Sequence, residues 1–153
     1  MSQLKIVKAD DVHPQNIRGF GEEAGQVKRV IATEKFFFNV DEVSPGFSPH
    51  HWHRHTKYRT GNMEIEYPAD FEEMYFILSG KGVIQWKTEN GEVREQEVGP
   101  GDAIHMPPGV VEHQLLNNGT EKIRLAVVGV PPPKRTRVYI IPNPPSERRN
   151  PIA

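Results

Sequence analysis

The sequence predicts an all-β protein built as one antiparallel sandwich or barrel. Short runs rich in β-branched and aromatic residues recur at spacings of roughly 8–12 residues, with clusters of Gly, Pro and Asn between them. No stretch shows a sustained helical period with a cap. The chain of 153 residues suits one domain that buries its own core, so a second domain is not expected.

The clearest local signal is Asn90-Gly91, because a type I′ turn requires positive φ at both central residues. It predicts a hairpin between residues 82–88 and 92–98. The turn sequence at 44–46, Ser-Pro-Gly, ends an earlier strand. The strand in the first arm of this hairpin is expected at residues 83–86. The other expected strands are 27–33, 36–43, 73–78, 103–106, 111–116 and 123–130.

Composition and charge exclude several classes of function. The net charge of −1 argues against a general nucleic-acid binder, which normally carries a basic excess. Cysteine is absent, so a metal would be held by imidazole and carboxylate groups. Residues 1–12 contain charged side chains and no continuous apolar segment, so neither a signal peptide nor a membrane span is expected. We expect a soluble, cytoplasmic protein with a small-molecule substrate and without nucleic-acid or membrane partners.

Both ends of the chain are predicted to be arms. Residues 1–26 follow an irregular pattern, and the glycines near residue 20 have the wrong spacing for a dinucleotide-binding loop. Residues 131–153 are rich in proline and basic side chains. Two interpretations of this second arm stay open: a solvated end, or a dimer arm in which the apolar run 138–141 pairs across a subunit interface. On the second interpretation the protein is a homodimer.

The most unusual stretch is a histidine cluster, since four of the seven histidines lie between positions 50 and 55. Alternate side chains of a β-strand share a face, so His51 and His53 are expected to project together, as would His55 if the strand continues. His50 is then expected to point away and to be structural.

Later strands supply further donors. Glu73 is expected to share a face with Tyr75, whereas Glu72 falls on the opposite face. His113 begins another alternating run. Histidines and one carboxylate brought together from three strands suit a divalent metal of the iron, manganese, nickel, copper or zinc kind.

Two groups of residues also have a motif-like order. The first has a Gly, a His-x-His, a Glu and a Gly seven positions later: Gly46, His51, His53, Glu73 and Gly80. The second has a Gly, Pro-x-Gly, His and Asn: Gly101, Pro107, Gly109, His113 and Asn117. Together they resemble the two motifs of the cupin superfamily, and the resemblance covers about residues 27–130.

The resemblance implies a small double-stranded β-helix, or jelly-roll, barrel over residues 27–130 between the two arms. It implies one divalent transition metal, with Fe(II) or Mn(II) favoured and Ni, Zn or Cu also compatible. It selects Glu73 rather than Glu72, because Glu73 has the required spacing from the following Gly. The implied ligands are His51, His53, Glu73 and His113.

The chain departs from the family pattern in two places. Residues 54–72 separate the second His from the Glu, where the family usually has only a few residues. We expect this insertion to extend a hairpin or to fold as a lid that sets substrate specificity, with a plain surface loop as the alternative. One extra residue also lies between Gly109 and His113, with Glu112 directly before the histidine.

With four protein ligands, an octahedral metal keeps two positions for a small, oxygen-rich substrate or for dioxygen. The function expected is a metal-dependent dioxygenase or a lyase or isomerase, with Tyr75 and His55 as candidate catalytic groups for proton transfer. Phe36, Phe38 and Trp86 are expected to form apolar walls. The alternatives are a non-catalytic module that binds or senses a small ligand through the metal, and a structural barrel with an incidental metal.

Overall fold

The computed structural model describes residues 3–17, 21–50, 52–53, 58–60, 63–65, 70–109 and 112–131. Two short 3-10 helices, η1 (Ala9–Asp11) and η2 (Glu22–Ala24), precede most of the strands. The strands are β1 (Gln15–Asn16), β2 (Gly25–Ala32), β3 (Phe37–Val43), β4 (Tyr58–Thr60), β5 (Met63–Ile65), β6 (Glu72–Ser79), β7 (Gly82–Lys87), β8 (Val93–Val98), β9 (Ala103–Met106), β10 (His113–Leu116) and β11 (Ile123–Val130).

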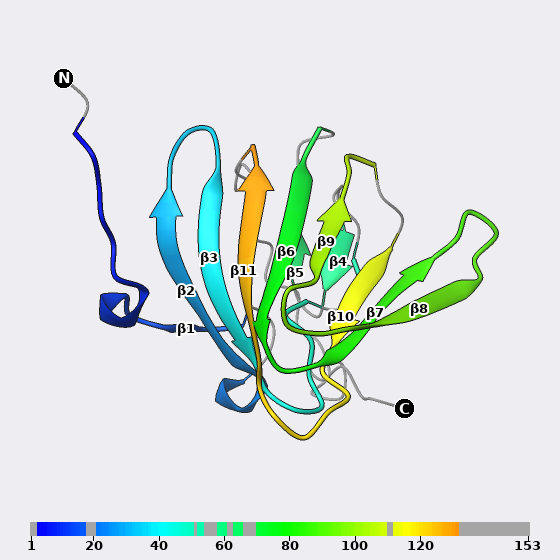
Figure 1. Ribbon diagram of the computed structural model, residues 1–153. Helices are drawn as coiled ribbons and strands as arrows, with labels where there is room; N and C mark the ends of the chain where they lie inside the picture. The colour runs from blue at the N-terminus through cyan, green and yellow to red at the C-terminus, as the bar shows by residue number, and fades with distance from the viewer. Residues whose placement is uncertain are drawn as a thin grey trace.

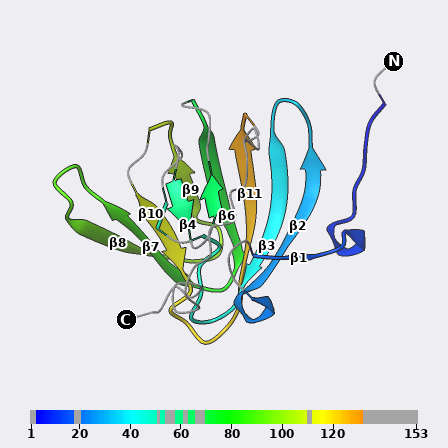
Figure 2. The ribbon, with the colours of Figure 1, turned by 180° about the vertical axis from the view of Figure 1, so that it is seen from behind.

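Two antiparallel sheets face each other in Figure 1. The larger has the order β1-β2-β3-β11-β6-β9 and the smaller the order β10-β7-β8. The sheets approach each other at the end where β10 connects to β11, and they splay apart at the other end (Figure 1). This arrangement confirms the predicted all-β jelly-roll architecture. In the view from behind, the N-terminal segment runs away from the sheets on the side of β2 (Figure 2).

The predicted strands are confirmed to within two residues at their described ends. The Asn-Gly turn joins β7 and β8, and Gly91 has a φ of +82°. The two-residue strand β1, which the sequence pattern does not indicate, pairs with β2, and Ile17 beyond it is 1% exposed in the core. Across the described parts of the chain, no helix is long and apolar enough to span a membrane.

Strict alternation along β6 sets the inner and outer faces of the larger sheet. Glu73, Tyr75 and Ile77 are buried and point inward, as predicted from the period of a strand. Three large apolar side chains of the same strand stay more than 40% exposed on the outer face: Met74, Phe76 and Leu78. The inner face of β6 therefore belongs to the core, and the outer face carries an uncovered apolar stripe.

The register of β3 corrects one prediction. Phe37, not its neighbours, faces the core, where its ring stacks on Phe71 with centroids 6.2 Å apart. The expectation that Phe36 and Phe38 line the interior is wrong, because the pattern of three consecutive phenylalanines does not reveal which face each one takes. Gly129 makes room for this packing, since a Cβ there would lie 2.1 Å from the Phe37 ring.

Asn117 ties the second motif to the first. Its Nδ2 donates to the carbonyl oxygens of Val43 at 2.9 Å and Glu121 at 2.8 Å, and its Oδ1 accepts from the Gly119 N–H at 3.1 Å. Its backbone carbonyl accepts from the Gly46 N–H at 2.8 Å. Asn117 is fully buried, so the motif asparagine has a structural role in closing the narrow end of the barrel.

Gly80 is required where β6 ends. Its φ is +81°, and a Cβ at this position would lie 2.4 Å from the carbonyl oxygen of Lys122. Only glycine combines this backbone conformation with such a close approach of two chain segments. The motif glycine therefore sets the crossing from the larger sheet to the smaller one.

The insertion contains the predicted hairpin, because β4 pairs with β5 in antiparallel register from Tyr58 opposite Ile65. Its function as a lid stays a prediction. The rest of the insertion falls outside the described residues apart from its last positions, and so do the C-terminal arm beyond Pro131 and its apolar run 138–141.

Candidate metal centre

Three predicted metal ligands meet inside the barrel. His53, Glu73 and His113 each offer one donor atom, and the three atoms lie within 4.8 Å of one another. Their side chains are 2%, 4% and 2% exposed respectively. Buried imidazole and carboxylate groups seldom gather in this way without a shared partner.

The donors come from separate parts of the chain. Glu73 lies near the start of β6, and His113 is the first residue of β10. His53 is held by an isolated bridge to His113, in which the His53 N–H donates to the His113 carbonyl at 3.1 Å and the His113 N–H donates back at 2.9 Å. The two imidazole centroids are 4.4 Å apart. Backbone pairing thus places the two histidine side chains together.

The donor set fits a divalent transition metal. Such an ion lies roughly 2.0–2.2 Å from nitrogen and oxygen ligands, so its donors are separated by roughly 3–4 Å. Small side-chain rotations would bring donors within 4.8 Å of one another onto one ion. Two imidazoles and a carboxylate suit iron, manganese, nickel, copper or zinc, and leave positions for a substrate.

The remaining histidines of the cluster have different outcomes. His51 and His55, predicted as a ligand and a catalytic group, fall outside the described residues. The expectation that His50 points away is wrong, since its ring centroid lies 4.8 Å from that of His53. A bend at residues 49–50, where the Ser48 Oγ bonds to the backbone of His50, turns this segment out of the regular alternation of a strand.

Glu72 and Glu73 take the opposite faces that were predicted. Glu72 forms an exposed hydrogen bond with the His105 ring on the outer face of β6 and β9. Tyr75, predicted as a catalytic group, lies two residues after Glu73 on the inner face and is 1% exposed. It belongs to the core cluster and is not among the described residues that line the pocket between the two sheets, so its catalytic role stays a prediction.

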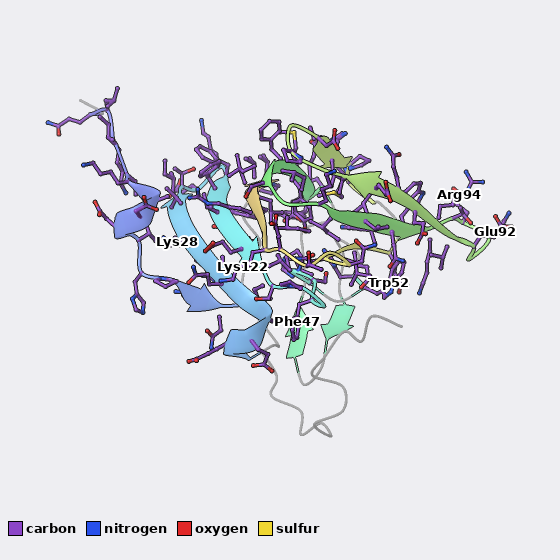
Figure 3. All side chains as sticks on the ribbon, turned by 60° about the horizontal axis from the view of Figure 1, so that its bottom comes forward. Lys28, Phe47, Trp52, Glu92, Arg94 and Lys122 are labelled. Carbon is purple, nitrogen blue, oxygen red and sulfur yellow. The ribbon has the colours of Figure 1, made fainter. Side chains whose placement is uncertain are left out.

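Lys87 of β7 connects the two histidine-bearing segments. Its Nζ pairs with the carboxylate of Glu112 and lies 5.2 Å from the centroid of the Trp52 ring. Glu112 precedes His113 in the chain and Trp52 precedes His53. Figure 3 shows Trp52 beside the β7–β8 hairpin, whose far end carries Glu92 and Arg94. Lys87 thus contacts the residue directly before each of the two candidate histidine ligands.

A pocket of about 430 Å³ opens between the two sheets at β7, β8 and β9. Most of its walls are apolar, and Trp86 lines it as predicted. His113 belongs both to this lining and to the three-donor cluster. The apolar lining residues are Ile84, Trp86, Val98, Ala103, Ile104 and Met106, and the polar ones are Gln96, Asp102, His105 and His113.

Asp41 is a buried acid that the sequence pattern did not mark as functional. It is 3% exposed on the inner face of β3. Burial, reinforced by the negative charge of Glu73 and opposed by Arg29, raises the pKa of Asp41 to about 8. The signal that could have found it was an aspartate on the same alternating face of the strand as Phe37 and Val43, since aspartate is depleted in strands.

A family model for the cupin domain matches residues 39–129. This chain belongs to the cupin family. The matched segment includes all three donors and the residues that line the pocket. A curated relative of this cupin is a vicilin-like seed storage protein of Arabidopsis thaliana, 28% identical over 100 residues. The match covers 64% of this chain but only 17% of that protein, so the chain spans a small part of its length.

Solved structures share the fold of this cupin. The polyketide cyclase RemF from Streptomyces resistomycificus superimposes with a TM-score of 0.64 at 22% identity, covering 95% of this chain and 91% of that one. KdgF from a Halomonas species superimposes with a TM-score of 0.58 at 13% identity, and the match covers 84% of this chain and 94% of that one. A predicted oxalate decarboxylase from Thermotoga maritima superimposes with a TM-score of 0.57 at 17% identity, and the match covers 82% of this chain and 98% of that one. The neighbours thus include enzymes, and at these identities the likeness establishes the fold alone.

Proposed function

We propose that this cupin is a metal-dependent enzyme that acts on a small oxygenated metabolite, as a dioxygenase or as a lyase or isomerase. The observation that carries the proposal is the position of His113. It is a donor of the buried cluster and it also lines the pocket. A molecule in the pocket would therefore lie beside the ion that the cluster holds. This arrangement is typical of an active site, where apolar walls and a few polar groups converge.

The pocket favours a particular kind of substrate. Its walls combine the Trp86 ring and aliphatic side chains, which suit a carbon ring, with the polar groups of Gln96, Asp102 and His105, which suit oxygen substituents. Vicinal oxygen atoms on that ring would provide the bidentate ligand that suits adjacent open positions of a metal. We therefore propose a ring compound with a chelating pair of oxygens.

The bound metal would supply Lewis acidity toward these oxygens, or a place to activate dioxygen. Glu73, His53 and His113 would hold it, and their burial keeps bulk water from competing for the same groups. Tyr75, on the same face as Glu73, is the proposed group for proton transfer at the substrate. The cyclase activity named for RemF is compatible with this reaction class, but fold likeness does not transfer it.

The test is reconstitution of the metal-free full chain with Fe(II), Mn(II), Ni(II) or Zn(II) in turn. Each form is offered a panel of ring diols and hydroxy ketones, with oxygen uptake and product formation both recorded. Oxygen uptake with the iron form identifies a dioxygenase, and product without uptake identifies a lyase or isomerase. Saturable binding without turnover by any form would contradict the enzyme proposal and favour the non-catalytic module.

We propose further that the protein acts as a homodimer through the outer face of β6. Met74, Phe76 and Leu78 each leave more than 40% of their surface exposed on one strand. Such a contiguous apolar stripe is characteristic of an interaction surface.

A further inference from the structure

Asp41 is a buried acid to which the proposed reaction assigns no role. It is 3% exposed, and among the described residues its Oδ1 has no hydrogen-bond partner. A buried carboxyl oxygen without a donor is unfavourable, and native proteins keep few such groups. The cost is explained if a molecule that enters the barrel supplies the missing partner.

The strand register places Asp41 on the inner face with the metal centre. Asp41 pairs with Leu125 of β11, which pairs in turn with Ile77 of β6, and both of these partners belong to the core. Two rows further along the same face lies Glu73. Residues paired across β3, β11 and β6 form rows on this face. The row of Asp41 is followed by a row that contains Asn39 and Tyr75, and then by the row that contains Glu73.

The electrostatics agree with this placement. The charge of Glu73 contributes to the raised pKa of Asp41, so the two carboxyl groups share the barrel interior. Arg29 of β2, which lowers that pKa, is exposed although it pairs with the inner-face residue Asn39.

We propose that Asp41 is a second ligand-binding group, which hydrogen-bonds a hydroxyl or carbonyl oxygen of the molecule held at the metal centre. This inference rests on the proposed function, because the metal centre holds the other end of the ligand. The ligand class is then narrower: a ring compound with a chelating oxygen pair and a further oxygen remote from that pair. Asp41 would select for the remote oxygen, since a buried polar group discriminates strongly against an analogue that leaves it unpaired.

The experiment compares two probes on the metal-loaded full chain. Catechol carries only the chelating pair of oxygens, whereas alizarin carries the same pair on a three-ring quinone with further carbonyl oxygens. The variants are Asp41→Leu and the nearly isosteric Asp41→Asn. The matched control is Glu42→Gln, the next residue of β3, whose carboxylate accepts a hydrogen bond from Gln26 outside the site. Metal content, the unfolding midpoint and the Kd of each probe are measured.

The expected result is that both Asp41 variants keep their metal and their catechol affinity, and that Asp41→Leu binds alizarin about tenfold more weakly or worse. Asp41→Asn should keep most of the alizarin affinity, because its amide still offers a donor and an acceptor. Without a probe, Asp41→Leu should unfold at a temperature no lower than the parent, because an unsatisfied buried oxygen is removed. Unchanged alizarin affinity in Asp41→Leu with metal retained would overturn the inference, as would an equal loss for both probes. A different result would show that the proposed metal centre itself is wrong: Glu73→Gln would then retain its metal in the same metal analysis.

Discussion

His53 and His113 exchange two backbone hydrogen bonds, at 3.1 and 2.9 Å, and their imidazoles lie side by side. Main-chain pairing therefore sets the positions of these two candidate ligands. Such a site is preorganised, so replacing one side chain should remove the ion without unfolding the barrel. This separation of fold from metal binding makes the following experiments interpretable.

Glu73→Gln should lower metal affinity by more than about 100-fold, because loss of a direct ligand exceeds the effect of losing an outer contact. The matched control is Glu72→Gln, which changes an exposed partner of His105 on the opposite face and should keep its metal. Both are measured by metal analysis and calorimetric titration. Equal metal content in the two variants would refute the assignment of the carboxylate ligand.

Lys87→Met should weaken metal binding by about three- to tenfold, because an ion pair and a cation–π contact each contribute up to about 1 kcal/mol. Lys87 contacts Glu112 and Trp52, the residues directly before His113 and His53. Lys81→Met, at an exposed position just before β7, is the control. A titration that shows no difference between the two variants would mean that Lys87 does not position the ligands.

Asn117→Ala should destabilise the fold by about 2–4 kcal/mol, since the buried carbonyl oxygen of Val43 and the partly buried one of Glu121 lose their donor. Asn117→Asp should cost more, because a carboxylate would then face the oxygens of Val43 and Glu121. Urea unfolding measures both, with metal content recorded for the folded fraction. A loss below about 1 kcal/mol in both variants would show that this network does not close the barrel.

Asp41 should make the metal-free protein less stable as pH rises. Its pKa is about 8 in the folded state, against 3.8 for an ordinary aspartate in the unfolded chain, so between these values only the folded chain holds the proton. Its contribution to stability is complete below the unfolded pKa of 3.8 and is lost as pH rises through about 8, with a slope of at most about 1.4 kcal/mol per pH unit. Urea unfolding across this range should show Asp41→Asn gaining stability over the parent as pH rises. A constant difference between the two proteins would contradict the raised pKa.

Phe76→Glu should convert a dimer to a monomer in light scattering, because it places a charge in the middle of the exposed stripe of β6. Val93→Glu, at a position 55% exposed on the β7–β8 hairpin, is the control and should leave the mass unchanged. A parent protein that is already monomeric, or a Phe76→Glu dimer, would exclude this interface.

Local patterns were sufficient to predict much of this molecule. Alternation along residues 73–78 assigns Glu73 and Tyr75 to one face, and the Asn-Gly pair predicts the hairpin, because both depend on a few adjacent residues. The resemblance to the cupin motif selected Glu73 over Glu72 through its spacing to Gly80, a position where the backbone requires glycine.

The tertiary structure decided what depends on register and on distant segments. Phe37 rather than Phe36 or Phe38 faces the core because pairing with β11 sets the face, and a shift by one residue would reverse it. The sequence by itself determined the kinds of donor and the fold class. Only the packed sheets brought His53, Glu73 and His113 within 4.8 Å of one another and buried Asp41 on the same inner face, because burial and proximity arise from contacts between remote strands.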